Sequence, residues 1–268
     1  MEQATYLASV NGEIMGVHEA TVPVTDEGLV RGDGVFEVVR IYDGQLFAAE
    51  EHYARLQRSA ENLRLKVDLE LVRTEASKLL AAAAADASGP LNQALRIMCT
   101  RGGRRIALTE PLYEYPDNIR LKSIEYAPTR ILDGIKSLSY GANRLASRLA
   151  QEQGYDEALL VMPEGKVLEG PTAAIFWVKE GQLHTPPLSD HILASITRQL
   201  VIDTVPVVEQ SVTLPELLDA DEVFLASTMR EVAPVGQIDG VEFGGDRPVS
   251  KRVAEQVGAR IAELTGQA

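Results

Sequence analysis

The first third of the chain carries short apolar-rich runs separated by turn residues. Runs over 4–10 and 13–22 flank an Asn-Gly dipeptide, and a longer run over 35–50 contains an Asp-Gly dipeptide. These dipeptides between two strand-like runs are typical of tight hairpin turns, because both residues tolerate a positive φ. The pattern therefore predicts two β-hairpins near the N-terminus.

Helical spacing follows the second hairpin. Within 50–65, apolar residues recur every three or four positions from Tyr53 onward, which predicts a helix. The alanine-rich run over 69–87 predicts another helix, because alanine is a strong helix former and Ser-Gly-Pro follows the run. Strands are expected over 93–100 and 105–112, joined by the turn Arg-Gly-Gly-Arg.

A polar, proline-containing stretch separates this part from a second one with the same mixture of patterns. We therefore expect a small N-terminal domain over 1–112, a linker over 113–117 and a larger C-terminal domain over 118–268. In the second domain we expect strands over 118–128, 157–162, 166–170, 173–178, 182–185 and 222–228, and helices over 139–154, 195–205, 214–220 and 249–264. Hairpins mixed with helices, without a long repeat, indicate an α+β fold in two layers.

Composition narrows the function classes. The chain has 268 residues, 45% of them hydrophobic, and a formal net charge of −13. That charge argues against nucleic acid or an anionic membrane as the main partner, although local arginines can still bind a small anion. The one cysteine, Cys99, excludes an internal disulfide framework and favours a reducing compartment, here the cytoplasm. We expect no signal peptide, and no run approaches the roughly 20 apolar residues of a membrane span.

Two charged residues, Lys136 and Glu169, could hold a pyridine aldehyde phosphate. Lys136 is flanked by Ile135 and Leu138 at an expected strand end before a helix, where an amine loses its proton more easily than in water. Such an amine can form a Schiff base. A carboxylate such as Glu169 can keep the ring nitrogen protonated. Taken singly, Lys136 is more typical of a solvated surface lysine, and Glu169 is more typical of an ordinary turn acid.

Two hydroxyl-bearing segments could bind the phosphate. Ile196 and Thr197 stand near an expected helix start, where free backbone N–H groups suit an anion, and Thr228 follows an expected strand. Ser195 or Thr197 could instead be a helix cap. Arg55 lies on the polar face of the first long helix and could bind phosphate or remain solvated.

Other common motifs are missing. Glycines 28, 32 and 34 have the wrong spacing for a dinucleotide fingerprint or a P-loop, and they are interpreted as turns. The four histidines show no metal-ligand spacing, so no metal is expected, and no Gly-x-Ser-x-Gly elbow is present.

In order and spacing, six segments resemble the fold-type IV pyridoxal-phosphate enzymes, also called class-IV aminotransferases. The segments are RGDGVFEVVRIYDG, EHYARL, KSLSY, DEALLVMPEGKVLEGPTAAIFWVKEGQLHTPPL, ILASITRQLVI and ADEVFLASTMREVAPV. The resemblance covers nearly the whole chain. It implies an α+β fold with a small N-terminal α/β sandwich and a larger C-terminal pseudo-barrel, pyridoxal 5′-phosphate between them, and a homodimer.

The resemblance also assigns roles to residues. Lys136 matches the catalytic Schiff-base lysine, and Tyr140 resembles a tyrosine near the cofactor oxygen. The implied cofactor-binding residues are Arg55, Lys136, Tyr140, Glu169, Thr172, Ala173, Ile196, Thr197, Ser227 and Thr228, and the implied substrate-binding residues are Phe36, Arg40, Arg101 and Met229. The implied function is transfer of an amino group between a D-amino acid or a branched-chain L-amino acid and a 2-oxo acid, through the Lys136 Schiff base.

The resemblance leaves the subgroup open. The helix around Arg55 is similar to D-amino-acid aminotransferases, whereas Tyr140 and the Leu-Glu-Gly-Pro-Thr turn favour branched-chain enzymes. Release of pyruvate from aminodeoxychorismate and (R)-amine transamination are the alternatives. The Thr-Arg-Gly segment lacks the Arg-x-His that usually binds the substrate carboxylate in D-amino-acid enzymes. Possible substitutes are Arg40, Arg101, Arg104 and Arg105.

Overall fold

The computed structural model describes residues 6–267, which form two compact units. The first unit holds the chain up to Tyr113 together with Ile135–Tyr140 and Leu264–Gln267, and the second holds Glu114–Gly134 and Gly141–Glu263. The first unit therefore includes the segment that carries Lys136, although this segment comes late in the sequence. The predicted linker over 113–117 and the contiguous domains on either side of it stay a prediction.

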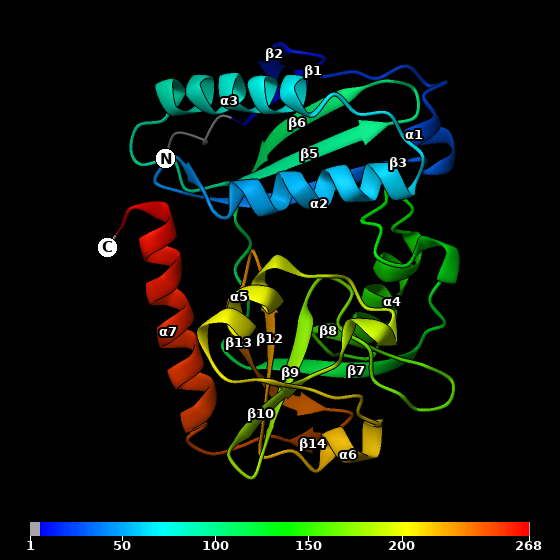
Figure 1. The fold of residues 1–268 in the computed structure, drawn as a ribbon, viewed down its shortest axis with the longest axis vertical. Helices are drawn as coiled ribbons and strands as arrows, with labels where there is room; N and C mark the ends of the chain where they lie inside the picture. The colour runs from blue at the N-terminus through cyan, green and yellow to red at the C-terminus, as the bar shows by residue number, and fades with distance from the viewer. Residues whose placement is uncertain (1–5, 268) are drawn as a thin grey trace. The chain divides into compact units, whose positions relative to one another are not determined.

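An antiparallel sheet with the strand order β2-β1-β6-β5-β3-β4 forms the first unit. Its strands are β1 (Leu7–Val10), β2 (Glu13–Gly16), β3 (Gly34–Tyr42), β4 (Gln45–Leu46), β5 (Ala94–Thr100) and β6 (Arg105–Glu110), and its helices are α1 (Glu27–Arg31), α2 (Ala49–Asn62) and α3 (Leu69–Asp86). Helices α2 and α3 lie along this sheet (Figure 1). They share one core with it, which includes the buried residues Val39, Leu56, Leu79, Leu95 and Ile97.

Both predicted hairpins of the first unit are confirmed. β1 pairs with β2 across Asn11-Gly12, and β3 pairs with β4 across Asp43-Gly44. All four turn residues have a positive φ, as two-residue hairpin turns require to match the twist of their strands. Residues 4 and 5 of the first predicted strand lie outside the described residues.

The second unit is built on an eight-stranded sheet with the order β11-β10-β9-β12-β13-β7-β8, in which β14 also pairs with β13. Its strands are β7 (Ile119–Glu125), β8 (Glu157–Val161), β9 (Ala174–Lys179), β10 (Gln182–Thr185), β11 (Val208–Glu209), β12 (Glu222–Ser227), β13 (Glu231–Ile238) and β14 (Val241–Glu242), with α4 (Gly141–Glu152), α5 (Ile196–Thr204), α6 (Leu214–Leu218), α7 (Pro248–Thr265) and the 3-10 turns η1 (Arg130–Leu132) and η2 (Leu188–Asp190). The sheet curls into a half-barrel, and α7 runs along one side of this unit (Figure 1). The predicted α+β class is confirmed.

Strand β13 is absent from the sequence-based prediction, although it joins two halves of the sheet. It pairs antiparallel with β12 and parallel with β7. Pro234 and Gly236 weaken its strand pattern, because proline removes a ladder donor and glycine adds no packing. The structure accommodates them with a register shift between Val235 and Gln237.

Three local predictions are wrong. Lys136 does not end a strand, because the turn η1 precedes it and α4 begins only at Gly141. The expected strand over 166–170 forms isolated bridges at Lys166 and Val167 instead. The glycines interpreted as turns have three different settings: Gly28 lies in α1, Gly32 caps it and Gly34 starts β3.

The length and apolar composition of the helices can be compared with those of a membrane-spanning helix. Across residues 6–267, none of the helices combines the length and the apolar composition that crossing a bilayer requires.

Candidate active site

The backbone of Lys136 is fixed by two elements of the first unit. Its N–H donates to Ser59 Oγ on α2 at 3.1 Å, and its carbonyl oxygen accepts from Phe36 N on β3 at 3.0 Å. The next residue, Ser137, forms an isolated antiparallel bridge with Val35. The segment that carries the predicted catalytic lysine is therefore extended along the start of β3, and its position does not depend on the lysine side chain.

Two aromatic rings surround the Lys136 amine. Nζ lies 4.4 Å from the centroid of the Phe36 ring and 5.6 Å from that of Tyr140. The two rings meet edge to face, with centroids 5.3 Å apart. Since α4 begins after Tyr140, the extended chain, and not a helical turn, brings Tyr140 close to Lys136. Three residues predicted to take part in binding thus lie together.

Arg55 is buried in the first unit, where it binds the carboxylate of Glu37. Arg55 Nε donates to Glu37 Oε1 and Nη2 to Oε2, both at 2.7 Å, while His52 Nδ1 lies 2.8 Å from Oε2. Burial raises the pKa of Glu37, but the charge and hydrogen bonds of Arg55, with those of His52, outweigh it and lower the pKa to about 2. Burial lowers the pKa of His52, which favours the neutral ring.

The roles of Glu37 and His52 in holding Arg55 were not predicted from the sequence. The sequence does contain a signal for each of these two residues. Glu37 interrupts the apolar strand VFEVV, and a charged residue at a buried position requires a partner. His52 stands one helical turn before Arg55, so the two share a face of α2.

Glu169 has a defined position in the second unit. Its Oε1 accepts from Leu193 N at 3.1 Å, and its carbonyl oxygen accepts from Leu160 N on β8 at 2.9 Å. Burial and the charge of Glu169 both raise the pKa of Tyr126. The Leu193 N–H therefore holds the carboxylate, the bond from Leu160 holds the backbone, and a second ionisable group lies close by.

The turn after Glu169 is tied to two neighbouring elements. Gly170 N donates to Ala173 O at 2.8 Å, and Asn143 Nδ2 on α4 donates to Pro171 O at 3.1 Å. Thr172 Oγ1 donates to Glu157 Oε1 on β8 at 3.2 Å. Thr172 and Ala173, both predicted to bind the cofactor, therefore have a fixed backbone.

Ser195 and Thr197 have different contacts at the start of α5. Ser195 is the N-cap, because its Oγ accepts from Arg198 N at 3.2 Å. Thr197 is 1% exposed, and its Oγ1 has no hydrogen-bond partner among the described residues. A buried hydroxyl without a partner beside the free N–H groups at Ile196 is suited to a phosphate oxygen.

Replacement of Thr197 by valine tests this use of the hydroxyl. We expect the dissociation constant of pyridoxal phosphate to rise by about tenfold, because a hydrogen bond to a charged group is lost. Titration of the apoprotein by absorbance gives this constant. Pyridoxal without phosphate should bind both proteins equally. Thr204→Val is the matched control, since Thr204 Oγ1 already donates to Leu200 O within the same helix. An equal loss with pyridoxal would contradict the assignment.

Ser227 and Thr228 lie at the end of β12, where the chain turns toward β13. The N–H of Arg230 donates to Ser227 O at 3.2 Å and lies 3.3 Å from Ser227 Oγ. This closes a turn around Thr228 and Met229, and their role in ligand binding stays a prediction.

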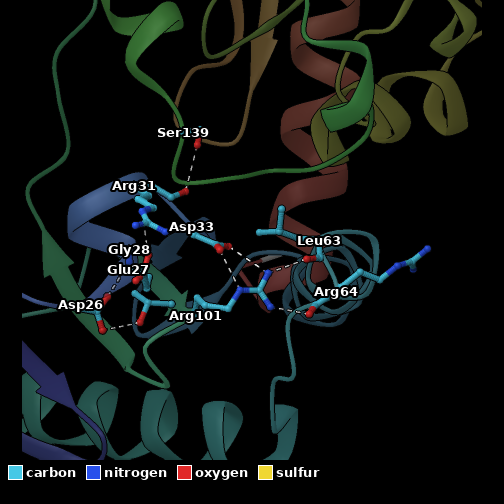
Figure 2. Close-up of polar contacts among 11 residues, drawn as sticks. Asp26, Glu27, Gly28, Arg31, Asp33, Leu63, Arg64, Arg101 and Ser139 are labelled. Carbon is cyan, nitrogen blue, oxygen red and sulfur yellow. Dashed lines mark hydrogen bonds and ion pairs between the residues drawn. The ribbon is translucent and has the colours of Figure 1, made fainter.

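Arg101, predicted to bind substrate, makes several contacts within the first unit (Figure 2). Its guanidinium donates to Asp33 at 2.9 and 3.2 Å, and to the carbonyl oxygens of Leu63 and Arg64 at 2.9 and 2.7 Å. These contacts tie the chain after β5 to the end of α2. Arg40 lies with its guanidinium 4.6 Å from the Tyr42 ring centroid. A substrate role for either arginine stays a prediction.

The residues present fit pyridoxal phosphate. The unpartnered Thr197 hydroxyl at a helix start suits the phosphate, the Glu169 carboxylate suits a ring nitrogen, and Lys136 supplies an amine. Lys136, Tyr140, Arg55 and Phe36 belong to the first unit, and the other predicted cofactor residues belong to the second.

Similarity to known proteins extends over most of the chain. The family model described as amino-transferase class IV matches residues 34–238. A putative branched-chain-amino-acid aminotransferase of Methanocaldococcus jannaschii is 37% identical, over 86% of this chain and 87% of that protein. A D-alanine aminotransferase of Bacillus licheniformis is 33% identical, over 89% and 90%. The branched-chain amino acid aminotransferase of Thermobaculum terrenum, solved in its PLP form, has a TM-score of 0.85 at 26% identity, covering 99% of this chain and 96% of that one.

Proposed function

Since this chain belongs to the class IV aminotransferase family and depends on pyridoxal phosphate, we propose that it moves an amino group between a D-amino acid or a branched-chain L-amino acid and a 2-oxo acid, with Lys136 as the catalytic residue. The observation that carries this proposal is the setting of the Lys136 amine. Its backbone is fixed by Ser59 and Phe36, and its Nζ lies against two aromatic rings.

Pyridoxal phosphate, when bound, supplies an aldehyde carbon that takes up the amino group and a ring that accepts the electron pair of the substrate carbon. Lys136 is the residue that would hold it covalently. The Lys136 amine would also act as the base: it would take the proton from the substrate α-carbon and later deliver a proton to the carbon that has received the amino group. One base on a fixed backbone is sufficient for both proton movements.

Glu169 would keep the ring nitrogen protonated. Its carboxylate accepts the Leu193 N–H, a contact that fixes the direction of the carboxylate. Thr197, Ile196, Ser227, Thr228 and Arg55 would hold the phosphate, with Thr172 and Ala173 in the turn beside Glu169. Phe36, Arg40, Arg101 and Met229 are the proposed substrate residues.

The choice of donor decides between the subgroups. Relatives named for branched-chain amino acids and for D-alanine support both donor classes. The alternatives are release of pyruvate from aminodeoxychorismate and transamination of (R)-amines, and in each the same lysine would act as the base.

A panel of donors tests the proposal on purified holoenzyme. D-Alanine, L-leucine, L-glutamate and (R)-1-phenylethylamine are added singly, and conversion of the cofactor to its aminated form is followed by absorbance. We expect D-alanine or L-leucine to convert it at least about tenfold faster than (R)-1-phenylethylamine, because only amino acids carry the carboxylate that orients the donor. A protein that reacts with no amine but releases pyruvate from aminodeoxychorismate would be a lyase.

We further propose a homodimer in the cytoplasm that acts on small molecules without nucleic acid or a membrane. Exposed large apolar residues support an interface on the first unit: Val24 is 81% exposed, and Leu29 and Val30 on α1 are 61% and 55% exposed. A monomer in sedimentation equilibrium would exclude the dimer.

A further inference from the structure

Arg230 is a buried arginine that sequence analysis did not assign. Its side chain is 7% exposed, and Nη2 forms an ion pair with Glu157 Oε2. Nε and Nη1 have no hydrogen-bond partner among the described residues. Nε carries one N–H group and Nη1 two, so most of this guanidinium's donors are buried without an acceptor. Such a group is rare in a folded protein and points to a ligand that supplies oxygen atoms.

The position of Arg230 connects it to the proposed cofactor residues of the second unit. It comes two residues after Thr228, and its own N–H closes the turn through Ser227. Glu157, its ion-pair partner, also accepts from Thr172 Oγ1 in the turn that follows Glu169. The guanidinium is therefore fixed relative to the two segments that are proposed to hold the cofactor's ring nitrogen and its phosphate.

The chemistry of the setting favours a carboxylate. Glu157 holds one nitrogen of the guanidinium and offsets its charge, which lowers the cost of burying it before a ligand arrives. The ring of Tyr115 lies 4.4 Å from the guanidinium carbon and covers its flat face. Ligand oxygens can then approach in the plane of the guanidinium, where the N–H groups of Nε and Nη1 point, and a charged carboxylate oxygen is a strong acceptor for each of these donors.

Two other arginines considered for the substrate carboxylate already have acidic partners. Arg101 donates to Asp33, and Arg105 donates to Glu75 at 2.8 to 3.1 Å. Both pairs are part of the first unit's own structure. Arg230 differs because its single acidic partner leaves Nε and Nη1 without an acceptor.

We propose that Arg230 binds the carboxylate of the amino acid and 2-oxo acid substrates. This rests on the proposed function, since it assigns the residue that distinguishes an amino acid from a plain amine at the same site. Glu157 is the positioning residue that fixes the guanidinium. Substrates without a carboxylate gain nothing from Arg230, so the residue sets specificity and does not act in the proton transfer.

The experiment compares each donor with its carboxylate-free counterpart on holoenzyme. D-Alanine is paired with ethylamine and L-leucine with 3-methylbutylamine, and the second-order rate constant of the half-reaction is measured by stopped-flow absorbance. In Arg230→Lys we expect this constant to fall at least about tenfold for the amino acid, because a charge-assisted hydrogen bond is lost, and to change less than about twofold for the amine.

A second variant tests whether the loss could come from misfolding of the first. Arg230→Met combined with Glu157→Gln leaves no unpaired charge and should show the same selective loss. Arg120→Met is the matched control, because Arg120 pairs with Asp156 in the same unit and is half-exposed. Calorimetric titration with propanoate, which carries a carboxylate but no amino group, gives a readout independent of turnover. We expect its dissociation constant to rise at least about tenfold in both Arg230 variants.

The outcomes separate the two proposals. Equal losses for amino acid and amine, or unchanged propanoate binding, would overturn the role of Arg230 while the wild-type protein still transfers amino groups. If the wild-type protein converts no donor at all, the proposed function fails, and propanoate binding alone then decides whether Arg230 binds a carboxylate.

Discussion

Replacing Lys136 with alanine is expected to lower the rate of amino transfer by at least about 10⁴-fold, because the change removes both the covalent anchor and the base. The fold should survive the change. The contacts that fix this segment, to Ser59 Oγ and from Phe36 N, involve the backbone of residue 136 and not its side chain. The measurements are the steady-state rate and, after borohydride reduction, the mass of the peptide that contains residue 136.

Two further variants sharpen this test. Lys136→Arg keeps the positive charge near Phe36 and Tyr140 but cannot form the covalent link, so it should be as inactive as the alanine variant. Lys251→Ala removes an exposed lysine that pairs with Asp246, and it should retain the wild-type rate and the modified peptide. Turnover in Lys136→Ala within about tenfold of wild type would exclude Lys136 as the catalytic residue.

Local sequence signals predicted the hairpins and the long helices. Asn11-Gly12 and Asp43-Gly44 specify their turns because few other residues adopt a positive φ at low cost. The alanine-rich α3 needs little help from packing, and Asp68 caps it as a helix start requires. These elements depend on neighbours in sequence, which are the interactions that a sequence pattern reports.

Elements that depend on distant partners were predicted poorly. β13 contains Pro234 and Gly236, and it exists as a strand because β12 and β7 pair with it on its two sides. The segment around Lys136 lies along β3, which is about a hundred residues earlier in the chain. The residues next to Lys136 in sequence therefore do not indicate its conformation. Tertiary pairing overrode local preference in both cases.

The candidate site shows the same division. Resemblance to a family supplied residues such as Lys136, Glu169 and Thr197, whereas the contacts that orient them were visible only in the structure. Thr197 differs from Ser195 in use, although both were candidates for a cap, because only Ser195 accepts the Arg198 N–H. Arg55, which the sequence left as bound or solvated, is buried against Glu37.

The buried ion pair between Glu37 and Arg55 is expected to contribute strongly to the stability of the fold. Both side chains are nearly inaccessible, and Glu37 is 1% exposed. Removing one partner of a buried ion pair leaves the other charge without compensation. We therefore expect Glu37→Gln to lower the free energy of unfolding by about 3–5 kcal/mol at pH 7, measured by urea denaturation of the apoprotein. Glu110→Gln breaks the partly exposed pair with Arg96 in the same sheet, and it should lower the free energy of unfolding by less than about 1 kcal/mol.

The difference in the free energy of unfolding between wild type and Glu37→Gln should become smaller at acidic pH. The pKa of Glu37 is lowered by Arg55 and His52, against the opposing effect of burial, from 4.5 to about 2. A lowered carboxyl pKa stabilises the fold fully above the unfolded value and loses that contribution as pH falls through the folded one. A shift of this size corresponds to about 3 kcal/mol. The gap in unfolding free energy should thus be constant from pH 5 to 7 and narrow steadily from about pH 4.5 toward pH 2. A gap that persists unchanged at low pH would mean that the charge of Glu37 does not stabilise the fold through Arg55.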